Sequence, residues 1–154
     1  MERTLIILKP DAVARGLIGA IIGRFEQKGF QIAAMKLARI AAPTARQHYA
    51  MHQGKPFYEG LIEFITSGPV VLLVLEGNGA IETARKMMGA TFGFKAEPGT
   101  IRGDFGLSSS FNLIHGSDSP AAAQAEISRF FTAEELLACP SARLQWVYDE
   151  AEKK

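Results

Sequence analysis

Residues 69–77, PVVLLVLEG, form the clearest strand signal in the chain. The run is apolar from Val70 to Leu75 and contains no alternating polar positions. A strand with one face in water alternates apolar and polar residues, whereas a strand covered on both faces does not. This stretch therefore predicts a strand at the centre of a sheet, and the neighbouring segments must supply its partners and its cover.

The segments before it predict two more strands and a helix. Residues 4–10, TLIILKP, favour a buried strand that Pro10 ends, and residues 30–40, FQIAAMKLARI, favour a second strand. Between them, residues 16–29 carry apolar side chains at helical spacing, with Gly29 as the stop. Further helices are predicted over residues 43–52, 58–68, 80–89 and 120–131, and a long loop without helical period over 89–111. The residues alone thus indicate one α+β domain with a mixed sheet covered by helices.

Composition narrows the class of protein. The 154 residues are 47% hydrophobic and 21% charged, which suits a single domain, 1–154, with a tail from about residue 138. A net charge of +1 gives no field that would attract nucleic acid, so we expect no nucleic-acid partner. Cys139 is the single cysteine, which excludes an internal disulfide. We find no signal peptide and no stretch long enough for a membrane span, and we expect a cytoplasmic protein.

Residues 112–120, NLIHGSDSP, raise the main question about function. A short strand through His115 is followed by Ser119 and Pro120, a natural N-cap and first helical residue. A lone histidine at a strand end is more often structural than catalytic, and His48 and His52 are expected to be solvated. Against that, helix N-termini favour anions, and Glu126 on the following helix could orient the imidazole of His115 and leave its other nitrogen as a nucleophile.

Cations from separate segments favour a phosphoryl substrate. Lys9, Arg85 and Arg102 each lie beside a turn or strand end, and their convergence on His115 would suit phosphoryl transfer. The chain has no G-x-x-x-x-G-K-[ST] loop and no G-x-G-x-x-G motif. A nucleotide enzyme of this sequence must therefore hold phosphates with side chains.

The segment NLIHGSDS resembles the active-site signature of the nucleoside diphosphate kinases. Other stretches are similar to the family's segments in its order, among them ERTLIILKPDAVARGLIG, HYAMHQGKPFYEGL and PGTIRGDF. The resemblance covers nearly the whole chain. It implies a ferredoxin-like βαββαβ core with an antiparallel sheet and additional helices, including two inserted between the second and third strands.

The resemblance also implies an activity. The γ-phosphoryl of a nucleoside triphosphate would pass to His115, on Nδ1, and then to a nucleoside diphosphate, with Mg²⁺ carried mainly by the nucleotide and no dedicated metal ligands. Family members form hexamers or tetramers, and the long tail favours a homo-hexamer. The implied site consists of the catalytic residues His115, Glu126 and Lys9; the nucleotide-binding residues Lys9, Tyr49, Phe57, Arg85, Thr91, Arg102 and Asn112; and the supporting residues Ser117 and Asp118.

Phe57 would stack on the base with little selectivity, and Asn112 would bind the ribose 3′-hydroxyl. Two positions depart from the family's pattern: Phe92-Gly93 follows Thr91 where Asn-Pro is usual, and Ser109 replaces an apolar residue near the base. Two other classes remain open, a non-catalytic binding module and an inactive relative acting through protein or nucleic-acid contacts. Labelling with γ-labelled ATP separates them from a kinase.

Overall fold

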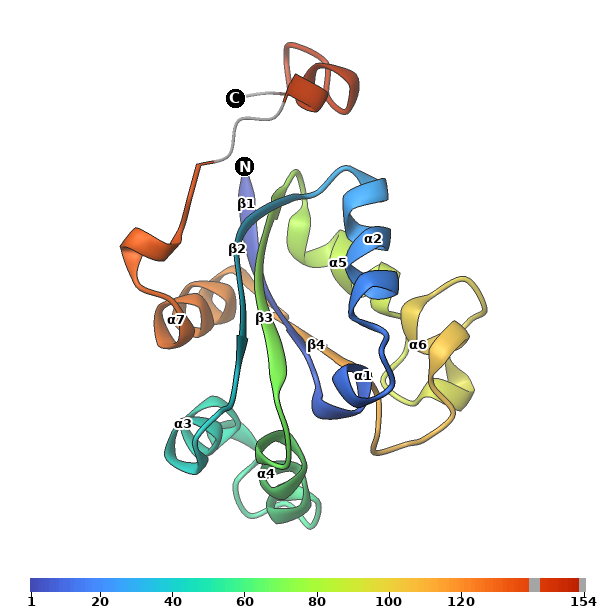
Figure 1. The fold of residues 1–154 in the computed structure, drawn as a ribbon, viewed down its shortest axis with the longest axis vertical. Helices are drawn as coiled ribbons and strands as arrows, with labels where there is room; N and C mark the ends of the chain where they lie inside the picture. The colour runs from blue at the N-terminus through green and yellow to red at the C-terminus, as the bar shows by residue number, and fades with distance from the viewer. Residues whose placement is uncertain (139–141, 153–154) are drawn as a thin grey trace.

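The computed structural model describes residues 1–138 and 142–152 and shows a four-stranded sheet with helices on both faces (Figure 1). The strands are β1 (Glu2–Leu8), β2 (Gln31–Ala38), β3 (Val70–Gly77) and β4 (Ile114–Gly116), in the order β2-β3-β1-β4. The α+β ferredoxin-like architecture is confirmed. The prediction of a mixed sheet from the residues alone was wrong, because every pairing among the described strands is antiparallel.

The helices divide between the two faces of the sheet. One face carries α1 (Pro10–Ala14), α2 (Ile18–Lys28), α5 (Ala80–Met88) and α6 (Ile101–Phe105), and the other carries α3 (Ala42–His48), α4 (Tyr58–Thr66) and α7 (Pro120–Phe130). Four short 3₁₀ helices complete the described chain: η1 (Ala50–His52), η2 (Gly93–Lys95), η3 (Ala133–Glu135) and η4 (Ala142–Trp146). The two helices between β2 and β3 lie where the family resemblance placed them.

The central strands are buried on both faces, as the unbroken apolar run of β3 predicts. Leu5 and Ile7 of β1 pack on the α3, α4 and α7 side, whereas Ile6 and Leu8 pack on the other. All four are inaccessible to solvent. Full burial of each such side chain contributes roughly 1.5–3 kcal/mol. The middle of the sheet is therefore a rigid base for residues at its ends.

Local sequence signals predicted several helix and strand boundaries correctly and missed others. Gly29 ends α2 with a φ of 106°, and the hydroxyl of Ser119 caps α7 by accepting from the N–H of Ala122. Pro10, expected only to end a strand, also opens α1. The region 89–111 is not a plain loop, since it contains η2 and α6.

The described tail returns toward the sheet: the Tyr148 hydroxyl accepts a hydrogen bond of 3.2 Å from the N–H of Asn78. Cys139 lies outside the described residues. Over the described residues, no helix is both long and apolar enough to cross a membrane.

Candidate active site

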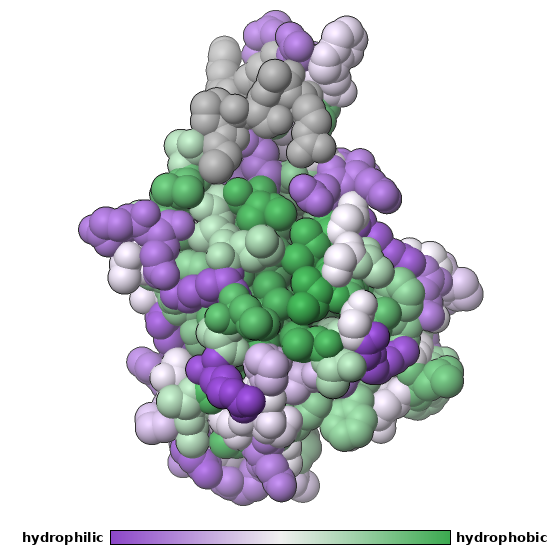
Figure 2. Space-filling view, in the orientation of Figure 1, coloured by the Kyte–Doolittle hydropathy of each residue, from purple (hydrophilic) through white to green (hydrophobic). Residues whose placement is uncertain are grey.

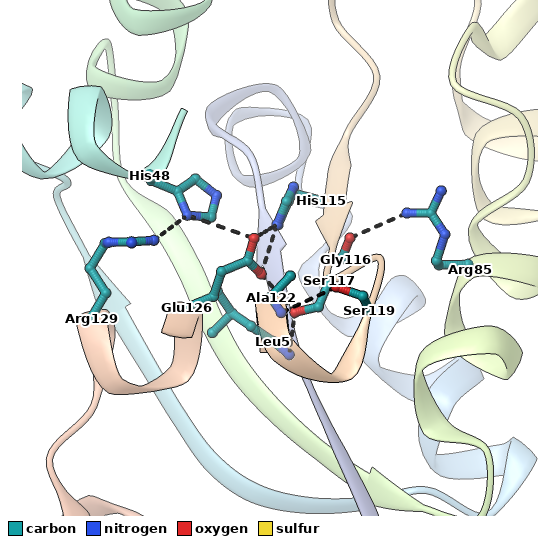
Figure 3. Close-up of polar contacts among 10 residues, drawn as sticks. All are labelled: Leu5, His48, Arg85, His115, Gly116, Ser117, Ser119, Ala122, Glu126 and Arg129. Carbon is teal, nitrogen blue, oxygen red and sulfur yellow. Dashed lines mark hydrogen bonds and ion pairs between the residues drawn. The ribbon is translucent and has the colours of Figure 1, made fainter. Parts of the chain in front are cut away.

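His115 lies on β4, at the edge of the sheet, directly opposite Ile7 of β1. Residues opposite each other in an antiparallel pair point to the same face, and Ile7 belongs to the face covered by α3, α4 and α7. The His115 side chain is 21% exposed. Its Nε2 lies 3.2 Å from both carboxylate oxygens of Glu126 (Figure 3). Its Nδ1 makes no hydrogen bond with the residues that the structure describes.

Glu126 is held in place by Ser117, which follows β4, and Ser117 is itself bound to Leu5 of β1. The Ser117 hydroxyl donates a 2.6 Å hydrogen bond to Glu126 Oε2 and accepts one from the N–H of Leu5 at 3.1 Å. Burial opposes ionisation of Glu126, but hydrogen bonds from His115 and Ser117 hold the pKa of its carboxyl below the ordinary value. An anionic Glu126 facing Nε2 places the imidazole hydrogen there and leaves the Nδ1 lone pair free.

A second group of polar side chains surrounds Asn112. The buried Lys9 Nζ donates to Asn112 Oδ1 at 2.7 Å, and Asn112 Nδ2 donates to the carbonyl of Thr91 at 3.1 Å. Burial, followed by repulsion from Arg102, lowers the pKa of Lys9 to about 8. One amide therefore joins the end of β1 to the start of the loop after α5.

Arg102 is buried and held by main-chain carbonyls. Its Nε donates to Asn112 at 3.0 Å, and its terminal nitrogens donate to Gly89 at 3.0 Å and Ile114 at 2.6 Å. A guanidinium carries five N–H groups, so two hydrogens remain for a ligand. Burial and the charge of Arg85 lower the pKa of Arg102 to about 10, which still leaves it a cation at neutral pH.

The remaining predicted residues lie around these two groups. The exposed Arg85 reaches the carbonyl of Gly116 at 3.5 Å, which places a cation beside β4. The Tyr49 ring is buried, with its centroid 6.1 Å from that of His115. Phe57, at the start of α4, is 54% exposed and has no ring contact with His115 among the described residues. The His52 ring stacks on Tyr49 at 6.3 Å and lies tilted against Phe57 at 5.3 Å. Asp118 is exposed in the turn between β4 and α7.

Leu113 adds a feature that the sequence did not indicate. It is buried and has a φ of 70°, a conformation that costs a non-glycine residue roughly 1–2 kcal/mol. Its N–H donates to Asp11 Oδ2 at 3.1 Å, and its carbonyl accepts from the N–H of Lys9 at 2.8 Å. These two bonds hold the strained residue, and the turn that it makes directs the chain into β4 and His115.

His48 was expected to be solvated, and this is wrong: it is only 4% exposed. Its ring lies edge-on to the His115 ring, with centroids 4.7 Å apart. Burial first, and the nearby His115 second, lower its pKa to about 3, so it stays neutral. Ala45, His48 and Tyr49 share the i, i+3, i+4 spacing of one helical face and are all buried, a signal that could have placed His48 inside.

Three side chains at this site are spaced closely enough to be considered as metal ligands. His48, His115 and Glu126 place three ligand atoms within 4.8 Å of one another. Two imidazoles and one carboxylate suit Zn²⁺ better than Mg²⁺, which prefers oxygen ligands. In addition, Arg129 already donates to His48 Nδ1 at 3.4 Å. Mg²⁺ therefore does not fit this cluster, and the exposed carboxylate of Asp118 is the better oxygen donor nearby.

Comparison with known proteins identifies the family. A family model described as nucleoside diphosphate kinase matches residues 2–136. The chain belongs to the nucleoside diphosphate kinase family. A nucleoside diphosphate kinase of Carboxydothermus hydrogenoformans is 55% identical over 97% of this chain and 100% of its own length. One of Roseiflexus castenholzii is 56% identical with the same coverage.

Solved structures of nucleoside diphosphate kinases have the same fold. The Halobacterium salinarum enzyme, described in complex with CDP, has a TM-score of 0.95 and 48% identity, over 96% of this chain and 99% of that chain. The Aquifex aeolicus enzyme has a TM-score of 0.85 and 46% identity, over 88% and 99% respectively. This family membership makes the chain an enzyme, a phosphotransferase that acts on nucleoside phosphates.

Proposed function

We propose that the enzyme works by a ping-pong mechanism in which His115 Nδ1 carries the phosphoryl group. The observation that supports this most directly is the contact of Nε2 with both oxygens of Glu126. Because that contact fixes the hydrogen on Nε2, the lone pair on Nδ1 is the free nucleophile. The 21% exposure of the side chain leaves it accessible to a substrate.

In the first half-reaction, the Nδ1 lone pair attacks the γ-phosphorus of a nucleoside triphosphate. The bond from that phosphorus to the bridging oxygen breaks, and its electron pair leaves with the diphosphate. The second half-reaction is the reverse, with a different diphosphate as acceptor. Lys9, Arg85 and Arg102 supply positive charge for the transferring group, whose stabilisation depends on positioning and electrostatics. Glu126 stabilises the positive charge that develops on the imidazole.

The nucleotide is proposed to lie with its base on Phe57 and its ribose 3′-hydroxyl at Asn112. Phe57 is exposed and therefore available, and every base has a face that can stack on it. Tyr49 and Thr91 complete the contacts to ribose and phosphate. Stacking gives low base selectivity, and the CDP bound in the Halobacterium relative is one pyrimidine nucleotide that such a site accepts.

Mg²⁺ is proposed to arrive with the nucleotide, with Asp118 nearby. When bound to the phosphates, the ion offsets their negative charge. In this proposal the protein side chains contact the nucleotide phosphates directly, through Lys9, Arg85 and Arg102. Ser117 keeps Glu126 in position. Activity measured against Mg²⁺ concentration at fixed nucleotide checks this proposal, since the rate should follow the concentration of the metal–nucleotide complex.

A homo-oligomer, with a hexamer favoured over a tetramer, is also proposed. β2 is an edge strand, and it exposes Met35 and Leu37 at 56% and 65%. Figure 2, in the same orientation as Figure 1, shows an apolar area in the middle of the molecule, at the position where Figure 1 draws β2 and β3. An exposed apolar edge is a surface that a second copy can cover. Sedimentation equilibrium of the wild type and of Leu37→Lys tests this.

We also propose a single-domain organisation and a cytoplasmic location. The family model matches residues 2–136, which supports a single domain over 1–154 with residues from about 138 as a tail. The single cysteine in the sequence supports a cytoplasmic location.

The deciding experiment is incubation with γ-labelled ATP. The wild type should acquire an acid-labile, alkali-stable label that it passes to ADP, GDP and CDP at similar rates, and His115→Ala should acquire none. An unlabelled wild type would contradict the mechanism and favour a non-catalytic binding module or an inactive relative. The presence of Lys9, Arg102 and His115 in this chain disfavours the binding module, and the net charge of +1 gives no support to an inactive relative that binds nucleic acid.

A further inference from the structure

Buried polar groups without a hydrogen-bond partner gather beside the proposed nucleophile. Five buried side-chain atoms in the described part of the chain have no hydrogen-bond partner. Three of them belong to His48, Tyr49 and Arg129. Figure 3 shows His48 and Arg129 beside His115 and Glu126, and the ring of Tyr49 packs against the rings of both histidines. Buried polar groups are nearly always paired, so this clustering beside the proposed nucleophile requires an explanation.

Arg129 determines which nitrogen of His48 carries the hydrogen. Its guanidinium can only donate, and it lies 3.4 Å from His48 Nδ1. That nitrogen must therefore be the acceptor, and in the neutral ring the hydrogen lies on Nε2. The unpartnered atom of His48 is consequently an N–H donor, and not a lone pair available to a metal.

The groups facing His48 keep its ring neutral. Glu126, from α7, has an oxygen 4.0 Å from Nδ1 and would favour a charged ring, whereas Arg129 from α7, His115 from β4 and Lys9 oppose it, as does burial. The rings of Tyr49 and Phe130 pack around it, at centroid distances of 4.5 and 5.3 Å. A neutral His48 cannot take Glu126 away from His115, whose nitrogen is nearer at 3.2 Å.

We propose that His48 is a further catalytic residue: its Nε2–H donates a hydrogen bond to an oxygen of the phosphoryl group while His115 carries it. This proposal rests on the phosphohistidine mechanism above. The donor has no partner in the resting enzyme and lies on a ring 4.7 Å from the His115 ring. A phosphoryl group on His115 would bring three acceptor oxygens to the neighbouring ring, and the proposed hydrogen bond would then exist only in the phosphorylated state.

A bond made only in one state shifts the equilibrium toward that state. The N–H donates without transferring its proton, so the bonds broken and formed are those of phosphoryl transfer alone. The phospho-enzyme is therefore more stable relative to ATP plus free enzyme, and its hydrolysis by water is slower. Because His48 stays neutral, its contribution is constant from pH 6 to pH 9.

The test uses His48→Phe, which keeps a buried ring without the donor, and His48→Asn, which keeps an N–H donor. The readout is the equilibrium between ATP plus enzyme and ADP plus phospho-enzyme, together with the hydrolysis half-life of the isolated phospho-enzyme. His48→Phe should lower the equilibrium constant about tenfold, as expected for one lost hydrogen bond, and should shorten the half-life. His48→Asn should recover part of both.

Ile62→Ala is the matched control, since it removes a buried side chain from the same apolar cluster without touching a polar group. It should lower thermal stability and leave the phospho-enzyme equilibrium unchanged. Equal equilibrium constants and half-lives for wild type and His48→Phe would overturn the proposal for His48 alone. A wild type that forms no phospho-enzyme would instead overturn the mechanism on which it rests.

Discussion

The Nζ of Lys9 donates a 2.7 Å hydrogen bond to the Oδ1 of Asn112, joining segments 103 residues apart. Both side chains are buried, and the positive charge of Arg102 repels that of Lys9. The bond orients the lysine, while burial lowers its pKa to about 8. The enzyme therefore keeps a cation in a place where a cation is costly until a phosphate arrives.

This cost predicts a pH dependence of stability. A lysine whose pKa is 10.5 unfolded and about 8 folded destabilises the native state fully below pH 8, and the penalty disappears as the pH rises toward 10.5. The free energy of unfolding of the wild type, minus that of Lys9→Met, should rise by roughly 3 kcal/mol across this window. Urea titrations at pH 7.5 and 10.5 measure it. Lys86→Met, at an exposed lysine, is the control. If the free energies of unfolding of the wild type and of Lys9→Met change by the same amount between pH 7.5 and pH 10.5, the prediction is refuted.

Ser117→Ala should weaken the hold on Glu126. Loss of the 2.6 Å bond raises the pKa of Glu126, so both the acid limb of activity and acid unfolding should move to higher pH. We expect kcat to fall roughly tenfold and stability to fall by about 1–3 kcal/mol, because the N–H of Leu5 loses its acceptor. Activity and unfolding measured from pH 4 to pH 8 give both limbs.

Ser119→Ala provides the comparison for that experiment. It removes the N-cap of the same helix at a cost of about 1 kcal/mol but touches neither His115 nor Glu126. Its acid limb should coincide with that of the wild type. A similar shift in both variants would mean that loosening of α7, and not the Ser117 bond, causes the effect.

At position 113, a glycine variant should be more stable than an alanine variant, which is the reverse of the usual order. Leu113→Ala and Leu113→Gly both lose the buried side chain, but only glycine relieves the strain at a φ of 70°. We expect Leu113→Gly to be more stable than Leu113→Ala by about 1 kcal/mol, measured by urea unfolding. The same pair at Ile6 in β1 should show alanine as the more stable residue. The same order at both positions would show that Leu113 is unstrained.

Ser109→Val tests the departure from the family's pattern near the base. Ser109 is exposed, and a valine there offers apolar surface that a bound base can cover. The KM for nucleotides should fall roughly three- to tenfold with kcat little changed, since burial of a few tens of Å² contributes about 1 kcal/mol. KM values measured with ATP, GTP and CTP should fall together, and unchanged values would show that position 109 does not contact the base.

The sequence predicted those features that local chemistry determines. The apolar run of β3, the helical spacing of α2 and the N-cap at Ser119 each depend on neighbours within a few residues. The strand order and the antiparallel pairing depend on contacts across the whole chain, and the spacing of apolar residues in the sequence does not reveal such contacts. The resemblance to a family, not the pattern of residues, supplied the correct sheet.

The same division applies to the candidate site. The nearness of His115 and Glu126 was predictable from one strand, one turn and one helix. The helical spacing of Ala45, His48 and Tyr49 could have indicated the burial of His48, whereas its contact with Arg129 of α7 forms only in the folded molecule and could not be predicted locally. Likewise, the positive φ of Leu113 could not be predicted, because the Asp11 carboxylate that holds it is distant in sequence.

The position of β1 between β3 and β4 has a consequence for synthesis on the ribosome. β1 is made before both of its partners, which lie at residues 70–77 and 114–116. Its apolar residues must wait unpaired until most of the chain has been translated, and slow, long-range pairing exposes such segments to aggregation. The pairing that needs the last strand in the chain, Ile7 with His115, is also the one that positions His115 in the candidate active site. Enzymatic activity in a nascent or refolding chain therefore reports completion of the sheet.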